Sequence, residues 1–231
     1  SSQTVRSIKA FSKTVTISYL SYDPSTASLI SATRPAFEVE IGVIAAVFLI
    51  LSGLAHGCIL VWWDAYANYI QQGINPYRWY EYALSSSLMI CAIAILFGCY
   101  DLASLVLMFA LNAAMNLFGL LMEILNPPSR PKTNWMPYIF GCWCGLASWT
   151  AIFLYFFAAS SSADSVPDFV YAILFCYVIF FNIFALNMYL QYKKIGKWNS
   201  YVFGEFVYIL LSLTSKSVLG WLVFGGTFQP N

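Results

Sequence analysis

Charged side chains are scarce in this sequence. Of its 231 residues, 9% are charged and 60% are hydrophobic, and the mean hydropathy is +0.71. A soluble domain carries about 25% charged residues, so this chain has too few to cover a water-facing surface of its size. The net charge of +1 argues against a nucleic-acid partner. The composition therefore predicts an integral membrane protein with one compact domain, residues 1–231, in a lipid bilayer.

Metal-ligating side chains are also few. The chain has one histidine, and none of its six cysteines shows the spacing of a zinc site. All six cysteines lie within or beside apolar segments, where a thiol usually acts as a small core residue. We therefore expect no metal site. Ser1–Ala10 lacks the apolar core of a secretory signal peptide.

Long apolar segments dominate the rest of the chain. Each has more than 20 residues, enough for a helix to cross a hydrocarbon core of about 30 Å. The six predicted transmembrane helices are Ile41–Trp63, Arg78–Tyr100, Leu102–Leu125, Met136–Ala159, Phe169–Tyr192 and Tyr201–Phe224. The sequence therefore predicts an all-α membrane bundle.

The segment before the first span has a different pattern. Lys13–Tyr22 alternates β-branched residues with serine and threonine, Asp23–Thr26 has turn-forming residues, and Ala27–Thr33 can form a second strand. We expect a β-hairpin within residues 11–38, in a loop outside the membrane.

Basic residues collect on one side of the predicted bundle. The loops on that side contain Arg78, Arg130, Lys132, Lys193, Lys194 and Lys197, whereas the opposite short loops contain Asp101, Asp164 and Asp168. Cytoplasmic loops are enriched in lysine and arginine, so the basic side is predicted to face the cytoplasm and the C-terminus the exterior. Four basic residues on the outer side weaken this bias: Arg6, Lys9, Lys13 and Arg34.

Two ionisable residues fall inside the spans, where charge is costly and usually functional. Lys216 lies deep in the last span and Glu81 lies early in the second. A buried lysine with a lowered pKa is what Schiff-base chemistry requires, and the resulting cation needs a counterion, for which Glu81 is the candidate. Ser212 and Ser85 each lie one turn away and can hydrogen-bond this pair. The alternative is a purely structural Lys–Glu pair joining two helices.

Three further titratable residues lie toward the basic side. His56 lies near the predicted depth of Glu81 and can relay a proton, or it is a hydrogen-bonded interior histidine. Glu123 and Glu205 lie near helix ends, where solvated or capped positions are expected rather than a proton relay.

Several segments resemble heliorhodopsins, a family of retinal-binding microbial rhodopsins with inverted topology. Arg78–Tyr82 with Ser85–Ile90 is similar to the third helix of the family, and Tyr208–Ser217 is similar to the seventh. Phe180–Lys193 resembles the sixth helix. Phe140–Cys142 and Leu54–His56 add shorter matches. The resemblance covers about residues 11–231.

The resemblance implies seven helices with a β-hairpin after the first, all-trans-retinal on Lys216, Glu81 as the single counterion, a homodimer and a cytoplasmic N-terminus. It implies a retinal pocket lined by Met89, Asn112, Trp149 and Phe181, with Ser85 and Ser212 near the Schiff base, and it places His56 in an inner polar cluster. Most of the family's first helix has no counterpart here, which we interpret as truncation. Asn116 and Ser148 occupy positions where an apolar residue and a proline are commoner.

The resemblance also favours one class of activity. Pumps in retinal proteins usually have a carboxylate four residues before the lysine, and often a second eleven residues after the counterion; these positions are Ser212 and Ala92. We therefore expect a light sensor, with no enzymatic activity and an unknown cytoplasmic signalling partner. The alternative is a light-activated passive proton channel whose path includes Glu81, His56, Glu123 and Glu205. A third hypothesis is a receptor or transporter that binds no retinal.

Overall fold

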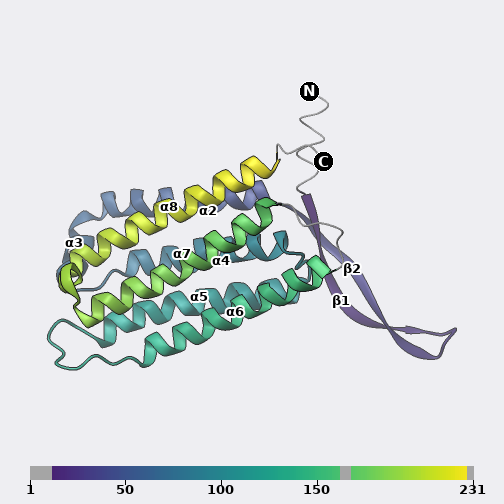
Figure 1. Ribbon diagram of the computed structural model, residues 1–231, viewed down its shortest axis with the longest axis horizontal. Helices are drawn as coiled ribbons and strands as arrows, with labels where there is room; N and C mark the ends of the chain where they lie inside the picture. Colours follow the sequence, from purple (N-terminus) through teal and green to yellow (C-terminus); the bar gives the residue numbers. More distant parts are fainter. Residues whose placement is uncertain (1–11, 162–167, 228–231) are drawn as a thin grey trace.

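The computed structural model describes residues 12–161 and 168–227, and shows a bundle of long helices with a β-hairpin projecting from one end (Figure 1). Within these residues the helices are α2 (Ile41–Val61), α3 (Trp63–Gln71), α4 (Pro76–Leu96), α5 (Leu102–Leu125), α6 (Met136–Ser161), α7 (Asp168–Lys193), the 3₁₀ helix η1 (Gly196–Asn199) and α8 (Tyr201–Thr227). All except α3 and η1 are long and apolar enough to cross a membrane. The predicted membrane bundle with six spans is confirmed. Ser1–Ala10 and Asp164 lie outside the described residues.

The predicted hairpin is present. Strand β1 (Ser12–Asp23) pairs antiparallel with β2 (Ser28–Glu40), and the Asp23 side chain accepts a hydrogen bond of 2.9 Å from the Ser25 backbone in the turn. The second strand runs beyond Thr33, where the prediction ended, because β2 stays paired with β1 as far as Glu40. A register irregularity between Val15 and Thr16 accompanies Pro35, which lacks the amide proton for a regular ladder.

The base of the hairpin is attached to the bundle. Val15 is fully buried, and the Thr16 backbone amide donates to the Tyr100 carbonyl oxygen at 2.8 Å. Asp101 caps α5 by accepting a hydrogen bond of 2.9 Å from the Ser104 amide, and it also accepts one from the Ser18 amide. The Ser104 amide holds the pKa of Asp101 below its ordinary value. One carboxylate therefore joins the start of a helix to the hairpin.

Helix boundaries at the other end follow local chemistry. Asn75 accepts a hydrogen bond of 3.1 Å from the Arg78 amide and Pro76 opens α4, which is the expected cap followed by proline. The assignment of Arg78 to the loop before the second span is wrong, because Arg78 lies in the first turn of α4 and its side chain is buried. The first span ends at Val61, and α3 begins separately at Trp63.

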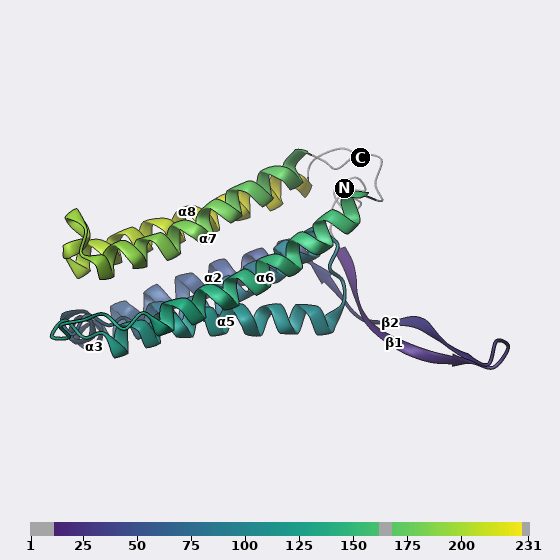
Figure 2. The same cartoon turned by 60° about the horizontal axis from the view of Figure 1, so that its bottom comes forward.

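Helix α4 lies at the centre of the bundle. It packs against α2 and α5, while α6 packs on α5 and α8 contacts both α7 and α2. In Figure 2, α7 and α8 form a pair beside the helices α2, α5 and α6. Gly119 lets α4 and α5 approach closely, because a Cβ atom there would lie 2.3 Å from the Trp79 ring. This packing brings α2, α4 and α8 together around a buried ion pair.

Candidate functional site

The predicted pair of Lys216 and Glu81 is formed. The Lys216 Nζ lies 2.6 Å from Glu81 Oε1, and both side chains are buried. Lys216 comes from the middle of α8 and Glu81 from the second turn of α4, so the two helices bring together residues 135 positions apart. Burial of both charges is tolerated because each neutralises the other and both form hydrogen bonds.

A third helix contributes Ser52, which the sequence analysis missed. Its hydroxyl donates to Glu81 Oε1 at 2.5 Å and accepts a hydrogen bond from Lys216 Nζ. Ser52 is a lone polar residue in an apolar stretch of α2, one turn before His56. That spacing is the only signal in the sequence that could have identified it.

The two serines predicted near Lys216 have different surroundings. Ser212 is buried one turn before Lys216, and both residues line the apolar cavity that is described below. Ser85 is fully buried, and its hydroxyl has no hydrogen-bond partner among the described residues. The hydroxyl that bridges the ion pair is therefore that of Ser52.

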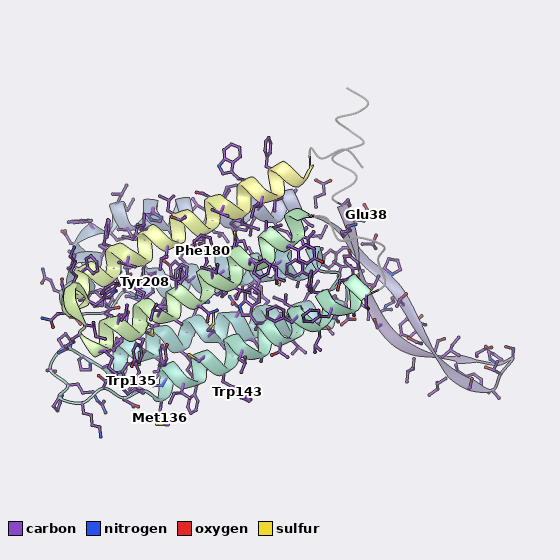
Figure 3. All side chains as sticks on the ribbon, viewed as in Figure 1. Glu38, Trp135, Met136, Trp143, Phe180 and Tyr208 are labelled. Carbon is purple, nitrogen blue, oxygen red and sulfur yellow. The ribbon has the colours of Figure 1, made fainter. Side chains whose placement is uncertain are left out.

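An apolar cavity extends from Lys216 between α4, α5, α6, α7 and α8. The side chains that line it are mainly aromatic or aliphatic, and they include Trp79, Tyr82, Ser86, Met89, Met115, Asn116, Pro137, Tyr138, Cys142, Phe180, Phe181, Phe184, Met188, Tyr208, Ser212, Ser215 and Lys216. Figure 3 labels Phe180 and Tyr208, which come from α7 and α8 on this side of the bundle. A long apolar molecule with one reactive end fits such a cavity, with its reactive end at Lys216.

Of the residues expected to line a retinal pocket, some line the cavity and others lie behind its wall. Met89 and Phe181 line the cavity directly. Asn112 lies behind Ser86 and donates to its hydroxyl at 2.7 Å, and Trp149 packs edge-on against Phe181 with a centroid distance of 5.4 Å. Asn116 lines the cavity and donates to Ser86 at 2.9 Å. The cavity wall on α4 and α5 is therefore polar at Ser86 and Asn116, and Asn112 holds the Ser86 hydroxyl from behind the wall.

A second buried ion cluster lies nearer the ends of the helices. The Arg78 guanidinium pairs with both Glu123 and Glu205, and each residue is at most 6% exposed. The Asn75 backbone amide donates to Glu123 at 2.8 Å, and its side-chain amide donates to Glu205 at the same distance. The expectation of solvated positions for both glutamates is wrong, because α4, α5 and α8 close around Arg78 and exclude solvent. Glu123 nevertheless accepts the Asn75 amide at the start of α4, which agrees with the expected capping role.

Aromatic rings separate the two ion clusters. The Arg78 guanidinium lies 4.5 Å from the Trp79 ring centroid and 4.0 Å from that of Tyr208. Tyr82 donates to the Tyr208 carbonyl oxygen at 3.0 Å, and its ring lies 5.3 Å from Lys216 Nζ. Both clusters therefore contact the same aromatic group, formed by Trp79, Tyr82 and Tyr208.

His56 is connected to the first cluster and not to the second. Its Nδ1 donates to the Ser52 carbonyl oxygen at 2.7 Å, and its side chain lies on an exposed face of α2. No contact joins His56 to Glu123 or Glu205 within the described residues. A relay through all three remains a prediction.

Comparison with known protein families identifies the chain. The family model for heliorhodopsin matches residues 4–228, which is nearly the whole sequence. No curated protein matches it. The family implies a retinal chromophore and a light-responsive rhodopsin, a class of photoreceptors or channels rather than of classical enzymes, and the six apolar helices fit its membrane bundle. The chain therefore belongs to the heliorhodopsin family of multi-pass membrane proteins.

Proposed function

We propose that Lys216 binds retinal, all-trans in the dark, as a protonated Schiff base with Glu81 as the counterion. The observation that supports this most directly is the position of the Lys216 Nζ, at the wall of the apolar cavity and 2.6 Å from the Glu81 carboxylate. Bound retinal supplies absorption of visible light and a change of shape on illumination.

The chain's own residues then have defined tasks. Glu81 keeps a positive charge on the Lys216 nitrogen, because a buried cation without an anion is costly. Ser52 holds the Glu81 carboxylate by its hydrogen bond of 2.5 Å. The rings of Tyr82, Phe181 and Phe184 line the cavity and keep water from the nitrogen.

For the whole protein we propose light sensing. Four residues before Lys216 stands Ser212, and eleven residues after Glu81 stands Ala92, which is fully buried in the apolar core. Neither position can hold a proton for a pump. A change of charge in the Lys216–Glu81 pair would reach Tyr82, whose ring lies beside Lys216 Nζ, and then Arg78 by way of Tyr208. An unidentified cytoplasmic partner would respond to that change.

One observation favours the alternative, a light-activated proton channel. Ser52 contacts Glu81 through its hydroxyl and His56 through its carbonyl oxygen, so two titratable residues of such a path lie beside one residue. The carbonyl oxygen only accepts a hydrogen bond, so a proton would need another group to pass between them. The continuation toward Glu123 and Glu205 is interrupted by the rings of Trp79 and Tyr208. The sensor is therefore the better-supported function.

Whole-cell voltage clamp under light pulses distinguishes the two functions. The cells are supplied with retinal, and both membrane voltage and the proton gradient are varied. The sensor predicts no photocurrent from a coloured protein at the cell surface. A current that reverses with the proton gradient would show a channel, and one that persists against the gradient would show a pump and contradict the argument from Ser212 and Ala92.

The topology and assembly are part of the same proposal. We infer that the end bearing Arg130, Lys132 and Lys193 faces the cytoplasm, because those side chains are exposed there and positive charge is retained on that side. The hairpin and the C-terminus are then extracellular, the cytoplasmic N-terminus that the resemblance implies requires the family's further helix ahead of the hairpin, and the proposed assembly is a homodimer. Protease accessibility of the hairpin on intact cells tests the orientation, and cross-linking tests the dimer.

A further inference from the structure

One end of the bundle carries an excess of exposed positive charge. Five exposed cations lie there, on the connections from α5 to α6 and from α7 to α8 (Figure 1): Arg130, Lys132, Lys193, Lys194 and Lys197. Among the described residues of that end, Asp64 is the exposed acidic side chain, because Glu123 and Glu205 are buried against Arg78. This end, which we call the basic end, can therefore attract an anionic partner.

Lys193 lies where the basic end meets an aromatic cluster. Its Nζ is 5.5 Å from the ring centroid of Trp135 and 5.8 Å from that of Tyr189. The Trp135 ring also packs against Tyr138 and Tyr189, both at 5.5 Å. Figure 3 labels Trp135 at the start of α6. Tryptophan and tyrosine gather at the depth of lipid headgroups, so Lys193 is placed at that depth.

A seam between α6 and α7 leads away from Lys193. Ala185, Tyr189 and Lys193 recur at every fourth residue of α7 and so share one stripe, and Tyr138 of α6 donates to the Ala185 carbonyl oxygen at 3.2 Å. Cys142, one turn beyond Tyr138, is exposed and also lines the cavity. The seam therefore runs about 12 Å along α7, from a cation to the mouth of the cavity.

The surface around this seam is apolar. Met136 and Ile139 of α6, Leu186 of α7 and Ile195 after α7 are each between 49% and 59% exposed. A ligand that matches both features has an anionic head and a long apolar chain. A soluble acidic protein would meet the cations but could not contact these apolar side chains, which face the bilayer.

We propose that the seam between α6 and α7 is a binding site for an anionic phospholipid. Its phosphate contacts Lys193 and Lys194, and one acyl chain lies over Tyr189 and Tyr138 toward Cys142. Positive charge near a membrane surface attracts anionic headgroups, and the aromatic rings supply the apolar contact for the first part of the chain. The headgroup site at Lys193 and Lys194 lies outside the cavity at Lys216, and the acyl chain reaches only the rim of that cavity at Tyr138 and Cys142, so binding does not depend on retinal.

Native mass spectrometry of the purified protein tests the proposal with two lipids of equal chain length, phosphatidylglycerol and phosphatidylcholine. We expect one tightly retained phosphatidylglycerol and weaker retention of phosphatidylcholine. The double variant Lys193→Gln/Lys194→Gln should weaken phosphatidylglycerol binding roughly 30-fold. The matched control, Lys13→Gln/Arg34→Gln, removes the same charge from the hairpin and should leave binding unchanged.

A second measurement uses the unaltered protein. Phosphatidylglycerol should slow maleimide modification of Cys142, measured on the Cys142 peptide, whereas phosphatidylcholine should have little effect. The proposal would be overturned if both lipids were retained equally, or if the hairpin control lost phosphatidylglycerol to the same extent as the double variant. It would also be overturned if glycerol phosphate competed as effectively as the intact lipid, a result that would indicate a soluble anionic partner. The Lys216→Ala protein should bind the lipid normally, so failure of the retinal proposal gives a different result.

Discussion

The side chains of Lys216, Glu81 and Ser52 come from three helices and meet in one group. Glu81 and Ser52 each affect the charge on the Lys216 nitrogen in a different way. Glu81 supplies the negative charge, and Ser52 supplies a hydroxyl that touches both partners. Neighbouring polar residues such as Ser85 are buried without joining this group. The charge at the Lys216 nitrogen therefore depends on Glu81 and Ser52, and single substitutions can measure the effect of each residue separately.

Replacing Glu81 with glutamine should shift the absorption maximum of the retinal-reconstituted protein to longer wavelength. The substitution removes the negative charge that favours the cation on the Lys216 nitrogen in the ground state. Absorption spectra of the two purified pigments measure the shift. An unchanged maximum would remove Glu81 as the counterion.

Ser52→Ala should shift the maximum in the opposite direction, by less than Glu81→Gln. Loss of the hydroxyl removes a hydrogen bond of 2.5 Å from the carboxylate and leaves more of its charge acting on the nitrogen. The control is Thr214→Val, which removes an exposed α8 hydroxyl that donates to the Leu210 carbonyl oxygen. Equal spectra for the unaltered protein and Ser52→Ala would show that the hydroxyl has no electrostatic role.

At the scale of helices, Arg78 holds together the ends of α4, α5 and α8. It is one buried cation paired with two buried carboxylates, so the cluster carries one excess negative charge. Removing the cation leaves two like charges without a partner, whereas removing one carboxylate leaves a neutral pair.

Arg78→Gln should therefore destabilise the protein by about 3–5 kcal/mol, and Glu123→Gln by much less. Thermal unfolding of the two detergent-solubilised variants measures the difference. The double variant Arg78→Gln/Glu123→Gln should recover part of the loss, because one of the two unpaired charges is gone. If Glu123→Gln were as harmful as Arg78→Gln, the charge count would not explain the stability of the cluster.

The hairpin depends on Asp101 in a comparable way. Asp101→Ala should loosen the start of α5, at a cost of about 1 kcal/mol for the lost cap, and should make residues 12–40 easier to cleave by protease. Asp101→Asn should be milder, since asparagine also caps helices. The pKa of Asp101 is lower in the folded state than its ordinary value of 3.8. The stability that the Asp101 carboxylate contributes is therefore fully present above pH 3.8 and is lost as the pH falls below that value. A protease sensitivity of the unaltered hairpin that stays constant down to pH 3 would contradict this.

The elements were predictable from sequence because their signals are local. Apolar length defines α5 and α6, alternation defines β1, and Asn75–Pro76 marks the start of α4. The rotation of each helix is not local, so it could not be derived that α2 turns Ser52 toward Glu81. Arg78 illustrates the same limit: a charge beside Pro76 is typical of a loop, and only the approach of α5 and α8 makes it a buried ion pair.

Viewed as a whole, the molecule has two buried ion clusters along α4 and α8, with Trp79, Tyr82 and Tyr208 between them. Glu81 and Arg78 are three residues apart on α4, and Lys216 and Glu205 are eleven apart on α8, so each pair lies near one face of its helix. A change at Lys216 therefore has a short route of packed side chains to the basic end. This arrangement suits a protein that reports light at one side of a membrane.

The most direct measurement is the visible absorption spectrum after the purified protein, the Lys216→Ala variant and a Lys193→Ala control are each incubated with all-trans-retinal. The account predicts a visible pigment in the unaltered protein and the control, and none in Lys216→Ala, because Lys216 alone among the lysines of residues 12–161 and 168–227 presents its nitrogen to the apolar cavity beside a buried carboxylate. A colourless unaltered protein, or a pigment that survives Lys216→Ala, would contradict the claim that Lys216 binds retinal.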